Sequence, residues 1–257
     1  MKFRNKKKTY IFALAIPTFN NHYDIQKLYK NFKKAKLKNY FICFIDDSYN
    51  NSTIKEIKKN FKKHYTVIKG PRLRNGRCAA VKTGFDWILK NINTEVIIEM
   101  DSDLSYNPLD IKKGLKALKN HNDLVIGSKY LKNSIVKNRS KSRIFFSYLV
   151  SLICRKIFLN KITDYTNGFR FYNRYFLQKI VKKKLTYDSP SENLNILLFS
   201  IYLKGKIKEI PSFYEGNLTS HWSLGIFSII KLLLQTVIVI LRYLAKIFFY
   251  YNTTKYE

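Results

Sequence analysis

Short apolar runs alternate with amphipathic segments through the first half of the chain. Five of these runs have the length and composition of buried strands, at residues 9–16, 40–45, 65–68, 95–100 and 124–126. Helical patterns separate them, at residues 23–36, from Thr53 onward, at 78–89 and at 109–118. The stretch from Thr53 to Glu56 has the sequence of a capping box, which starts a helix. Strands that alternate with helices predict an α/β fold with a mostly parallel central sheet.

Beyond residue 130 the pattern changes and helices predominate. The expected elements are a strongly apolar helix, a polar loop that enters a short strand, two helices and a last strand, at residues 144–158, 164–172, 175–181, 192–203 and 207–210. No internal repeat or low-complexity linker interrupts this order. We therefore expect one domain at residues 9–222, followed by a hydrophobic tail at residues 223–257.

The tail is apolar but carries a narrow polar and basic stripe. Its longest charge-free run, residues 232–241, is shorter than the roughly 20 residues that span a bilayer. On a helix, the polar positions fall on one side, at Ser228, Lys231, Gln235, Arg242 and Lys246. This pattern predicts an amphipathic helix lying in the membrane interface. A helix packed on the domain or on a second subunit, and a tilted membrane span, are the alternatives.

The N-terminal apolar run has some features of a secretion signal. Lysines at 6–8 precede it, and Ala13-Leu14-Ala15 resembles a cleavage site. The run is short, however, and it enters Pro17-Thr18-Phe19-Asn20, which is typical of a strand that ends in a binding loop. We expect a first strand here, because cleavage would remove it from the fold.

Composition indicates a globular protein with an anionic partner. The 257 residues are 46% hydrophobic, and 48 Lys and Arg against 17 Asp and Glu give a net charge of +31. Such a charge favours nucleic acid, an anionic membrane surface or phosphorylated substrates as partners. The three cysteines are Cys43, Cys78 and Cys154, which lie far apart and fit a reducing, cytosolic compartment.

Two carboxylates stand one residue apart where the apolar run 95–100 ends. Asp101 and Asp103 begin a polar loop that continues to Pro108. In α/β folds ligands gather where parallel strands end, and paired carboxylates suit Mg²⁺ or Mn²⁺ that also holds a phosphate. By itself the pair is equally typical of a solvated loop.

Three other polar loops also follow predicted strands and should share the same sheet edge. They lie at residues 17–20, 46–48 and 70–78. Together with the polar loop that begins at Asp101, which is called the metal loop below, they would gather four Asp residues and several Arg residues. This mixture suits a metal-bound nucleotide diphosphate, because Asp can hold the ribose, base and metal while Arg binds phosphate oxygens.

Seven stretches in chain order carry a family resemblance. They are Pro17-Thr18-Phe19-Asn20-Asn21, Asp46-Asp47-Ser48, Arg72-Leu73-Arg74-Asn75-Gly76-Arg77-Cys78-Ala79-Ala80, Asp101-Ser102-Asp103-Leu104-Ser105, Gly127-Ser128-Lys129-Tyr130, Asp164-Tyr165-Thr166-Asn167-Gly168-Phe169-Arg170 and Ser220-His221-Trp222. With them the chain resembles the family 2 glycosyltransferases of the GT-A fold over residues 9–222. The branch that it resembles most is that of the dolichol- and polyprenyl-phosphate sugar synthases.

The resemblance implies a Rossmann-like GT-A domain and a set of site residues. The expected metal ligands are Asp101 and Asp103. The expected nucleotide-binding residues are Pro17, Thr18, Asn20, Asp46, Asp47, Arg74 and Ser102. The expected acceptor-binding residues are Arg143, Ser147, Thr166 and Arg170. The catalytic residues would be Asp103, Arg170 and Asp164, with Arg170 and Arg143 holding an acceptor phosphate and Asp164 orienting it.

The expected reaction is metal-dependent and inverting. A mannose- or glucose-like sugar would move from a GDP- or UDP-sugar to a dolichyl or undecaprenyl phosphate at the cytoplasmic face of a membrane. One alternative is transfer to a sugar hydroxyl, for which Asp164 would act as the base. Another is a non-catalytic protein that binds nucleic acid or membranes, and the intact motifs speak against it. We expect no nucleic-acid partner, whereas a homo-oligomer or a membrane partner could form through the tail.

Overall fold

The fold is described from a computed structural model of the chain. It describes residues 8–71, 76–182, 192–216 and 234–245. Several sequence predictions lie outside these residues, namely those for Arg74, for residues 220–222 and for the tail positions Ser228, Lys231 and Lys246.

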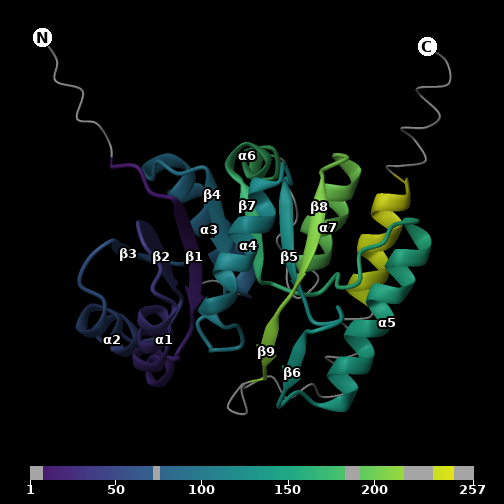
Figure 1. The fold of residues 1–257 in the computed structure, drawn as a ribbon. Helices are drawn as coiled ribbons and strands as arrows, with labels where there is room; N and C mark the ends of the chain where they lie inside the picture. Colours follow the sequence, from purple (N-terminus) through teal and green to yellow (C-terminus); the bar gives the residue numbers. More distant parts are fainter. Residues whose placement is uncertain (1–7, 72–75, 183–191, 217–233, 246–257) are drawn as a thin grey trace, which may run out of the picture.

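A seven-stranded sheet crosses the middle of the molecule (Figure 1). Its order is β3-β2-β1-β4-β7-β5-β8, and every described pairing is parallel except the two that β7 makes. The strands are β1 Phe12–Thr18, β2 Tyr40–Asp46, β3 Tyr65–Lys69, β4 Val96–Glu99, β5 Leu124–Ser128, β7 Arg170–Asn173 and β8 Ile207–Pro211. The predicted α/β fold with a mostly parallel sheet is confirmed.

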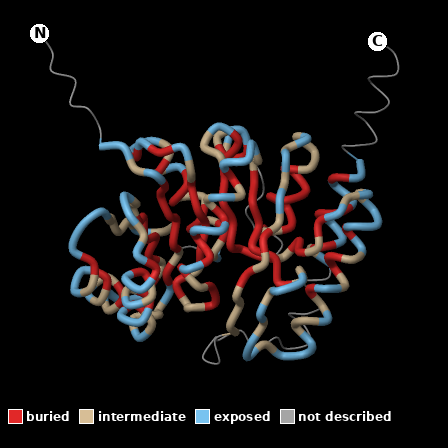
Figure 2. Tube along the Cα trace, in the orientation of Figure 1, coloured by how far each residue is buried: buried red, intermediate tan, exposed pale blue. Residues whose placement is uncertain are grey.

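Helices cover both faces of this sheet. They are α1 His22–Ala35, α2 Ser52–Asn60, α3 Gly76–Asn91, α4 Ile111–Lys119, α5 Lys141–Ile157, α6 Arg174–Lys182 and α7 Glu192–Tyr202, with a 3₁₀ turn, η1, at Pro108–Asp110. Alternate residues of β1 enter different cores. Phe12 and Leu14 pack with α1, α2 and α4, whereas Ala13 and Ala15 pack with α3, α6 and α7. The sheet is therefore buried on both sides (Figure 2).

Three local features differ from the sequence prediction. Helix α2 begins at Ser52 without a side-chain cap, because the buried Thr53 hydroxyl bonds Ser48 instead, at 3.2 Å. The first strand begins at Phe12 rather than at residue 9. A small second sheet pairs β6, Ile135–Lys137, with β9, Phe213–Glu215. Each of these two strands has only three residues, too few for a periodic pattern to mark them.

The antiparallel strand β7 determines the position of residues 164–169, which are called the acceptor loop because the sequence predicts acceptor contacts there. Its first residue, Arg170, is in register with Glu99 on one side and with Ile126 on the other. Because β7 runs against its neighbours, the loop that precedes it emerges at the edge where the parallel strands end. The segment from Asp164 to Phe169 is thereby brought to the same edge as the metal loop.

The described part of the tail, residues 234–245, is helical. One face packs on the domain, where Val239, Ile240 and Tyr243 are buried and the Tyr243 hydroxyl donates to Asn195 Oδ1 at 2.8 Å. The other face exposes apolar side chains, at Leu234, Val237, Ile238 and Leu241. Among the described residues, no helix has the length and apolar character needed to cross a membrane.

Candidate active site

The loops after β1, β2 and β4 meet through side-chain hydrogen bonds. Thr18 Oγ1 and Ser48 Oγ both donate to Asp46 Oδ1, at 2.9 and 2.7 Å. Ser102 Oγ donates to the carbonyl of Pro17 at 2.8 Å. Asp46 is only 2% exposed, so its carboxylate shapes these loops from within. The predicted nucleotide-binding residues of three separate strands are therefore neighbours.

Asp47 and Asn20 stand closer to the surface of this edge. The backbone of Gly70 packs against the Asp47 carboxylate so tightly that a Cβ at position 70 would lie 2.0 Å from Oδ1. Asn20 has a left-handed backbone, with φ of 51°, and its backbone N–H donates to Ser48 Oγ at 2.8 Å. Asp47 is half-buried, so it is better placed than Asp46 to contact a ligand.

Asp101 and Asp103 follow β4 on a short turned loop. Leu104 lies in the left-handed region at φ 67°, which is uncommon for a residue with a side chain, and the turn lets the Ser105 amide donate to Asp103 Oδ1 at 3.0 Å. Burial and the neighbouring Asp101 together raise the pKa of Asp103 to about 6. The two carboxylates thus lie in a negatively charged, partly desolvated corner.

This corner fits a divalent cation whose ligand set is completed by substrate. Among the described residues, no group of three or more His, Cys, Asp or Glu side chains is arranged to hold a metal by itself. Mg²⁺ is usually bound through one or two carboxylates, with phosphate oxygens and waters filling the other positions. Asp101 and Asp103 match that arrangement, and both are hard oxygen donors.

Arg77 at the start of α3 was not predicted as a site residue, although it lies in one of the seven motifs. Its Nε donates to Asp101 Oδ1 at 2.6 Å, and its Nη1 donates to Glu192 Oε2 at 3.3 Å. Its Nη2 lies 2.7 Å from Glu99 Oε1, an ion pair without hydrogen-bond geometry. One guanidinium therefore faces three carboxylates, and Asp103 adds a fourth negative group nearby.

The protonation of this cluster favours a charged arginine. Burial acts to lower the pKa of Arg77, but Asp101, Glu99 and Glu192 outweigh it and hold that pKa above its usual value. Burial raises the pKa of Glu192 to about 7 even though Arg77 acts to lower it. The guanidinium is thus cationic near neutral pH, and it is the group that makes an ionised Glu192 tolerable in the interior.

Asp164 is buried and surrounded by donors. Its carboxylate accepts from the Lys129 amide at 3.0 Å, from Lys129 Nζ at 2.8 Å and from the amide and hydroxyl of Thr166, both at 3.1 Å. Burial acts to raise its pKa, but Lys129 and these hydrogen bonds prevail and hold it below the ordinary value. Burial in turn lowers the pKa of Lys129. Asp164 and Lys129 form a fully enclosed ion pair.

Arg170 is not presented to a ligand, in contrast to the sequence prediction. Its side chain is 0% exposed, and the guanidinium donates to the carbonyls of Asn167, Tyr165 and Asn193, at 2.8, 3.5 and 2.6 Å. These bonds tie the acceptor loop to the first turn of α7. In this arrangement Arg170 shapes the loop, and the expected direct contact with an acceptor phosphate is not supported.

The remaining predicted acceptor residues lie around the start of α5. Ser147 is buried and its hydroxyl bonds Tyr130, while Arg143 is half-buried and its amide donates to the N-cap Ser140 at 3.4 Å. Arg139 lies just before α5 in the chain, and its guanidinium lies 5.1 Å from the ring centre of Tyr214. The side of the site next to α5 is therefore basic and aromatic.

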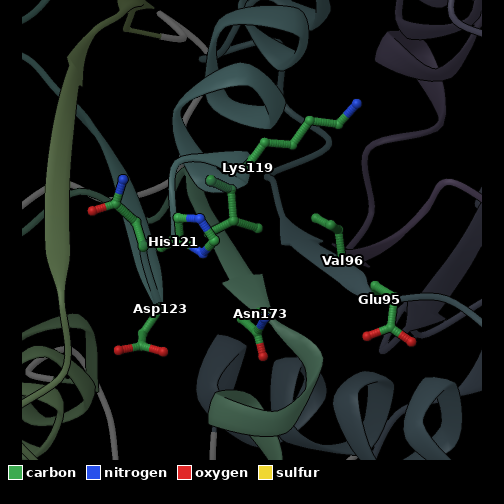
Figure 3. A pocket seen from close by; sticks show the side chains of 8 residues that line it. Glu95, Val96, Lys119, His121, Asp123 and Asn173 are labelled. Atoms are coloured by element: carbon green, nitrogen blue, oxygen red, sulfur yellow. The ribbon is translucent and has the colours of Figure 1, made fainter.

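A cavity lies at the opposite edge of the sheet from these loops (Figure 3). It measures about 380 Å³ and is lined in part by His121, Asp123 and Asn173. Its polar groups are used locally: Asp123 accepts from the Lys206 amide at 2.8 Å, and Asn173 accepts from the Tyr175 amide at 2.9 Å. These groups stabilise turns and helix starts, so we assign no chemistry to this cavity.

The family model described as glycosyl transferase family 2 matches residues 13–181. A dolichol-phosphate mannosyltransferase of Pyrococcus furiosus is 26% identical over 205 residues, which cover 77% of this chain and 54% of that protein. A polyprenol monophosphomannose synthase of Mycolicibacterium smegmatis is 36% identical over 105 residues, which cover 41% of this chain and 39% of that protein. This chain thus aligns with about half or less of these two curated relatives.

The architecture also recurs in solved structures. Glucosyl-3-phosphoglycerate synthase from Mycobacterium tuberculosis, in complex with Mn²⁺, UDP and its product, superposes with a TM-score of 0.64 at 13% identity. The superposition covers 92% of this chain and 80% of that one. At this identity the likeness concerns the fold alone.

Replacement of Asp103 by Asn removes one of the two carboxylates that are expected to bind the metal. We expect Asp103→Asn to weaken Mn²⁺ binding by at least about tenfold, because mutation of a group that only supports a metal ligand already lowers metal affinity by that factor. Titration of the purified protein with Mn²⁺ by calorimetry measures it. Asp86→Asn, on the exposed face of α3, is the control and should bind Mn²⁺ like the wild type. Unchanged affinity in Asp103→Asn would remove this residue from the metal site.

Replacement of Asp164 by Asn leaves Lys129 buried without its partner. Breaking such a pair costs about 3–5 kcal/mol of the free energy of unfolding. Because the folded-state pKa of Asp164 is lowered, this stabilisation is present above the unfolded value of about 3.9 and is lost as the pH falls through the folded value. Urea unfolding at pH 7 and at decreasing pH should show the wild type and Asp164→Asn converging in acid. A difference below about 1 kcal/mol at pH 7 contradicts the enclosed pair.

Proposed function

The chain belongs to glycosyltransferase family 2, and from this premise we propose that it transfers a sugar from a nucleotide-diphosphate sugar to a polyprenyl phosphate. The observation that carries the proposal is the position of the Asp101–Asp103 pair, at one sheet edge with the basic loop and helix that follow β5. GDP- and UDP-sugars are the proposed donors, and a mannose- or glucose-like sugar is the proposed group transferred.

The donor is proposed to lie along the loops after β1, β2 and β4. Asp47 and Asn20 would contact the nucleoside, and Asp101 and Asp103 would hold Mg²⁺ or Mn²⁺ against the diphosphate. A bound divalent cation neutralises charge on the leaving diphosphate. Support comes from the paired carboxylates of this chain and from the structural neighbour, which was solved in complex with Mn²⁺ and UDP.

An acceptor phosphate removes the need for a general base. A phosphate monoester has a second pKa of about 6 and is largely ionised at neutral pH. One of its oxygens attacks the anomeric carbon, the bond from that carbon to the diphosphate oxygen breaks, and the nucleoside diphosphate leaves. In-line attack inverts the anomeric carbon. Arg143, and Arg139 just before it in the chain, are the proposed sources of positive charge around this phosphate, whereas Lys129 is enclosed with Asp164.

Transfer to a sugar hydroxyl is less well supported, because that reaction needs a base. Asp164 is 0% exposed and saturated with donors, and Glu192 is 4% exposed and paired with Arg77. Neither carboxylate is placed to take a proton from an incoming hydroxyl. The names of the relatives from Pyrococcus and Mycolicibacterium also refer to lipid phosphates.

The proposed place of action is the cytoplasmic face of a membrane with anionic lipid. Helix α5 exposes Phe145 (67%), Tyr148 (50%) and Ile153 (41%), with Arg155 and Lys156 exposed beside them. The apolar outer face of residues 234–245 adds further exposed apolar surface. Apolar side chains flanked by Lys and Arg favour binding in the headgroup region. Docking of a second subunit on the same surface is the competing outcome.

The reaction is tested with labelled GDP- and UDP-sugars, Mn²⁺ and a membrane extract that contains polyprenyl phosphates. We expect one donor to yield label that moves into the organic phase, with loss of transfer in chelator. Label that stays in the aqueous phase on a saccharide would contradict the lipid-phosphate acceptor. Asp103→Asn serves as the inactive control for endogenous enzymes in the extract.

The membrane assignment is tested with a single charge on α5. Phe145→Asp places a carboxylate in the exposed apolar surface, and we expect several-fold weaker cosedimentation with vesicles that contain anionic lipid. Tyr175→Asp is the matched control, because Tyr175 is also 67% exposed but lies on α6. Equal loss in both variants would assign the binding to the overall charge, and a change in oligomeric state confined to Phe145→Asp would assign the surface to a second subunit.

A further inference from the structure

We infer that Arg77 is a positioning residue for the metal site, which orients Asp101 and packs against the acceptor loop. The inference rests on the proposed metal-dependent transfer and deepens it by naming the group that holds a metal ligand in place.

The three nitrogens of the Arg77 guanidinium face three different carboxylates. Nε contacts Asp101 at 2.6 Å, Nη2 contacts Glu99 at 2.7 Å and Nη1 contacts Glu192 at 3.3 Å. These acids belong to the loop after β4, to β4 itself and to the first turn of α7. A planar fork with fixed directions can hydrogen-bond Asp101 and Glu192 while it pairs with Glu99, a geometry that the ammonium of a lysine does not reproduce. The arrangement therefore depends on arginine rather than on positive charge alone.

The contact with Asp101 fixes the orientation of a predicted metal ligand. Asp101 is still 25% exposed in its side chain, so the fork does not remove it from the site. Glu99 is itself fixed, because the Tyr172 hydroxyl donates to its Oε2 at 3.0 Å. Arg77 thus connects a rigid carboxylate of the sheet to the carboxylate that would hold the cation. Groups that support metal ligands in this way commonly contribute about 10- to 100-fold to metal affinity.

The acceptor loop lies directly against the same guanidinium. A Cβ built on Gly168 would be 2.7 Å from Arg77 Nη2 and 3.3 Å from its Cζ, so only glycine leaves room for the fork. The residue after Glu192, Asn193, bonds the same loop: its side chain donates to the Thr166 carbonyl at 3.2 Å. Arg77 therefore stands where the metal loop, α7 and the acceptor loop meet.

Arg174 has a purely structural role and contacts the same two elements, α3 and β4. Arg174 lies at the other end of α3 and β4 and donates only to backbone carbonyls, those of Leu89, Ile92 and Thr94, at 2.6 to 3.1 Å. It anchors the helix to the strand without touching a carboxylate of the site. Arg174 is therefore a matched control for Arg77, because Arg77 contacts a predicted metal ligand and Arg174 does not.

The test compares Arg77→Lys with Arg174→Lys by Mn²⁺ titration of the full chain, without nucleotide or acceptor, together with thermal unfolding. We expect Arg77→Lys to weaken Mn²⁺ binding about tenfold or more, the range for a group that supports a ligand. Arg174→Lys should lower thermal stability and keep wild-type Mn²⁺ affinity. Wild-type affinity in Arg77→Lys, or equal loss in both variants, overturns the inference.

Gly168→Ala tests the same contact from the acceptor loop and does not alter the arginine. The added methyl group must displace the guanidinium, so Mn²⁺ affinity should fall several-fold although the residue is not a ligand. This variant keeps the inference testable if Arg77→Lys does not fold, and unchanged affinity in Gly168→Ala contradicts it.

The results also separate this inference from the proposed function. A wild-type protein without Mn²⁺ affinity contradicts the metal assignment and the inference together. Wild-type binding that neither Arg77→Lys nor Gly168→Ala weakens contradicts the inference alone. Weakened Mn²⁺ binding in both variants upholds the inference, even if no label reaches polyprenyl phosphate and the acceptor assignment fails.

Discussion

The antiparallel insertion of β7 between β4 and β5 is the constraint on which the candidate site depends. Backbone pairing sets Arg170 opposite Glu99 and Ile126, and this register leaves no freedom in where the preceding loop emerges. A parallel strand in the same place would carry that loop to the far edge, away from the carboxylates after β4. One reversed strand thus brings together two loops that are far apart in the sequence.

Buried charge then gives these loops their shape. The Asp164–Lys129 pair and the Arg77 cluster take several ionised groups out of water, which is costly unless each charge has partners of good geometry. Here the partners come from different elements, so the charges are satisfied only in the native arrangement. Ion pairs and hydrogen bonds thus connect α7 with both loops, and the stacked rings of Tyr106 and Phe169 join the metal loop to the acceptor loop.

Much of the fold could be predicted from the sequence, because apolar runs and helical periodicity report local structure. The position of Asp101 and Asp103 followed from an apolar run that ends in two acids. The partners of Arg77 could not be predicted: Glu192 lies 115 positions away, and no periodic pattern encodes such a pairing. Arg170 was expected to hold an acceptor phosphate because it is a permanent cation in the motif that ends at Gly168-Phe169-Arg170, and its carbonyl partners become apparent only once the loop is folded.

The central claim is that the acceptor is a phosphate, which needs no base; among the described residues, neither Asp164 nor Glu192 is placed to act as one. The most direct measurement compares transfer from the preferred labelled donor, with Mn²⁺, to a polyprenyl phosphate and to the polyprenol of the same chain length. The account predicts a lipid product with the phosphate and none with the alcohol, over a pH range in which the phosphate is ionised. Transfer to the alcohol at a comparable rate would contradict it.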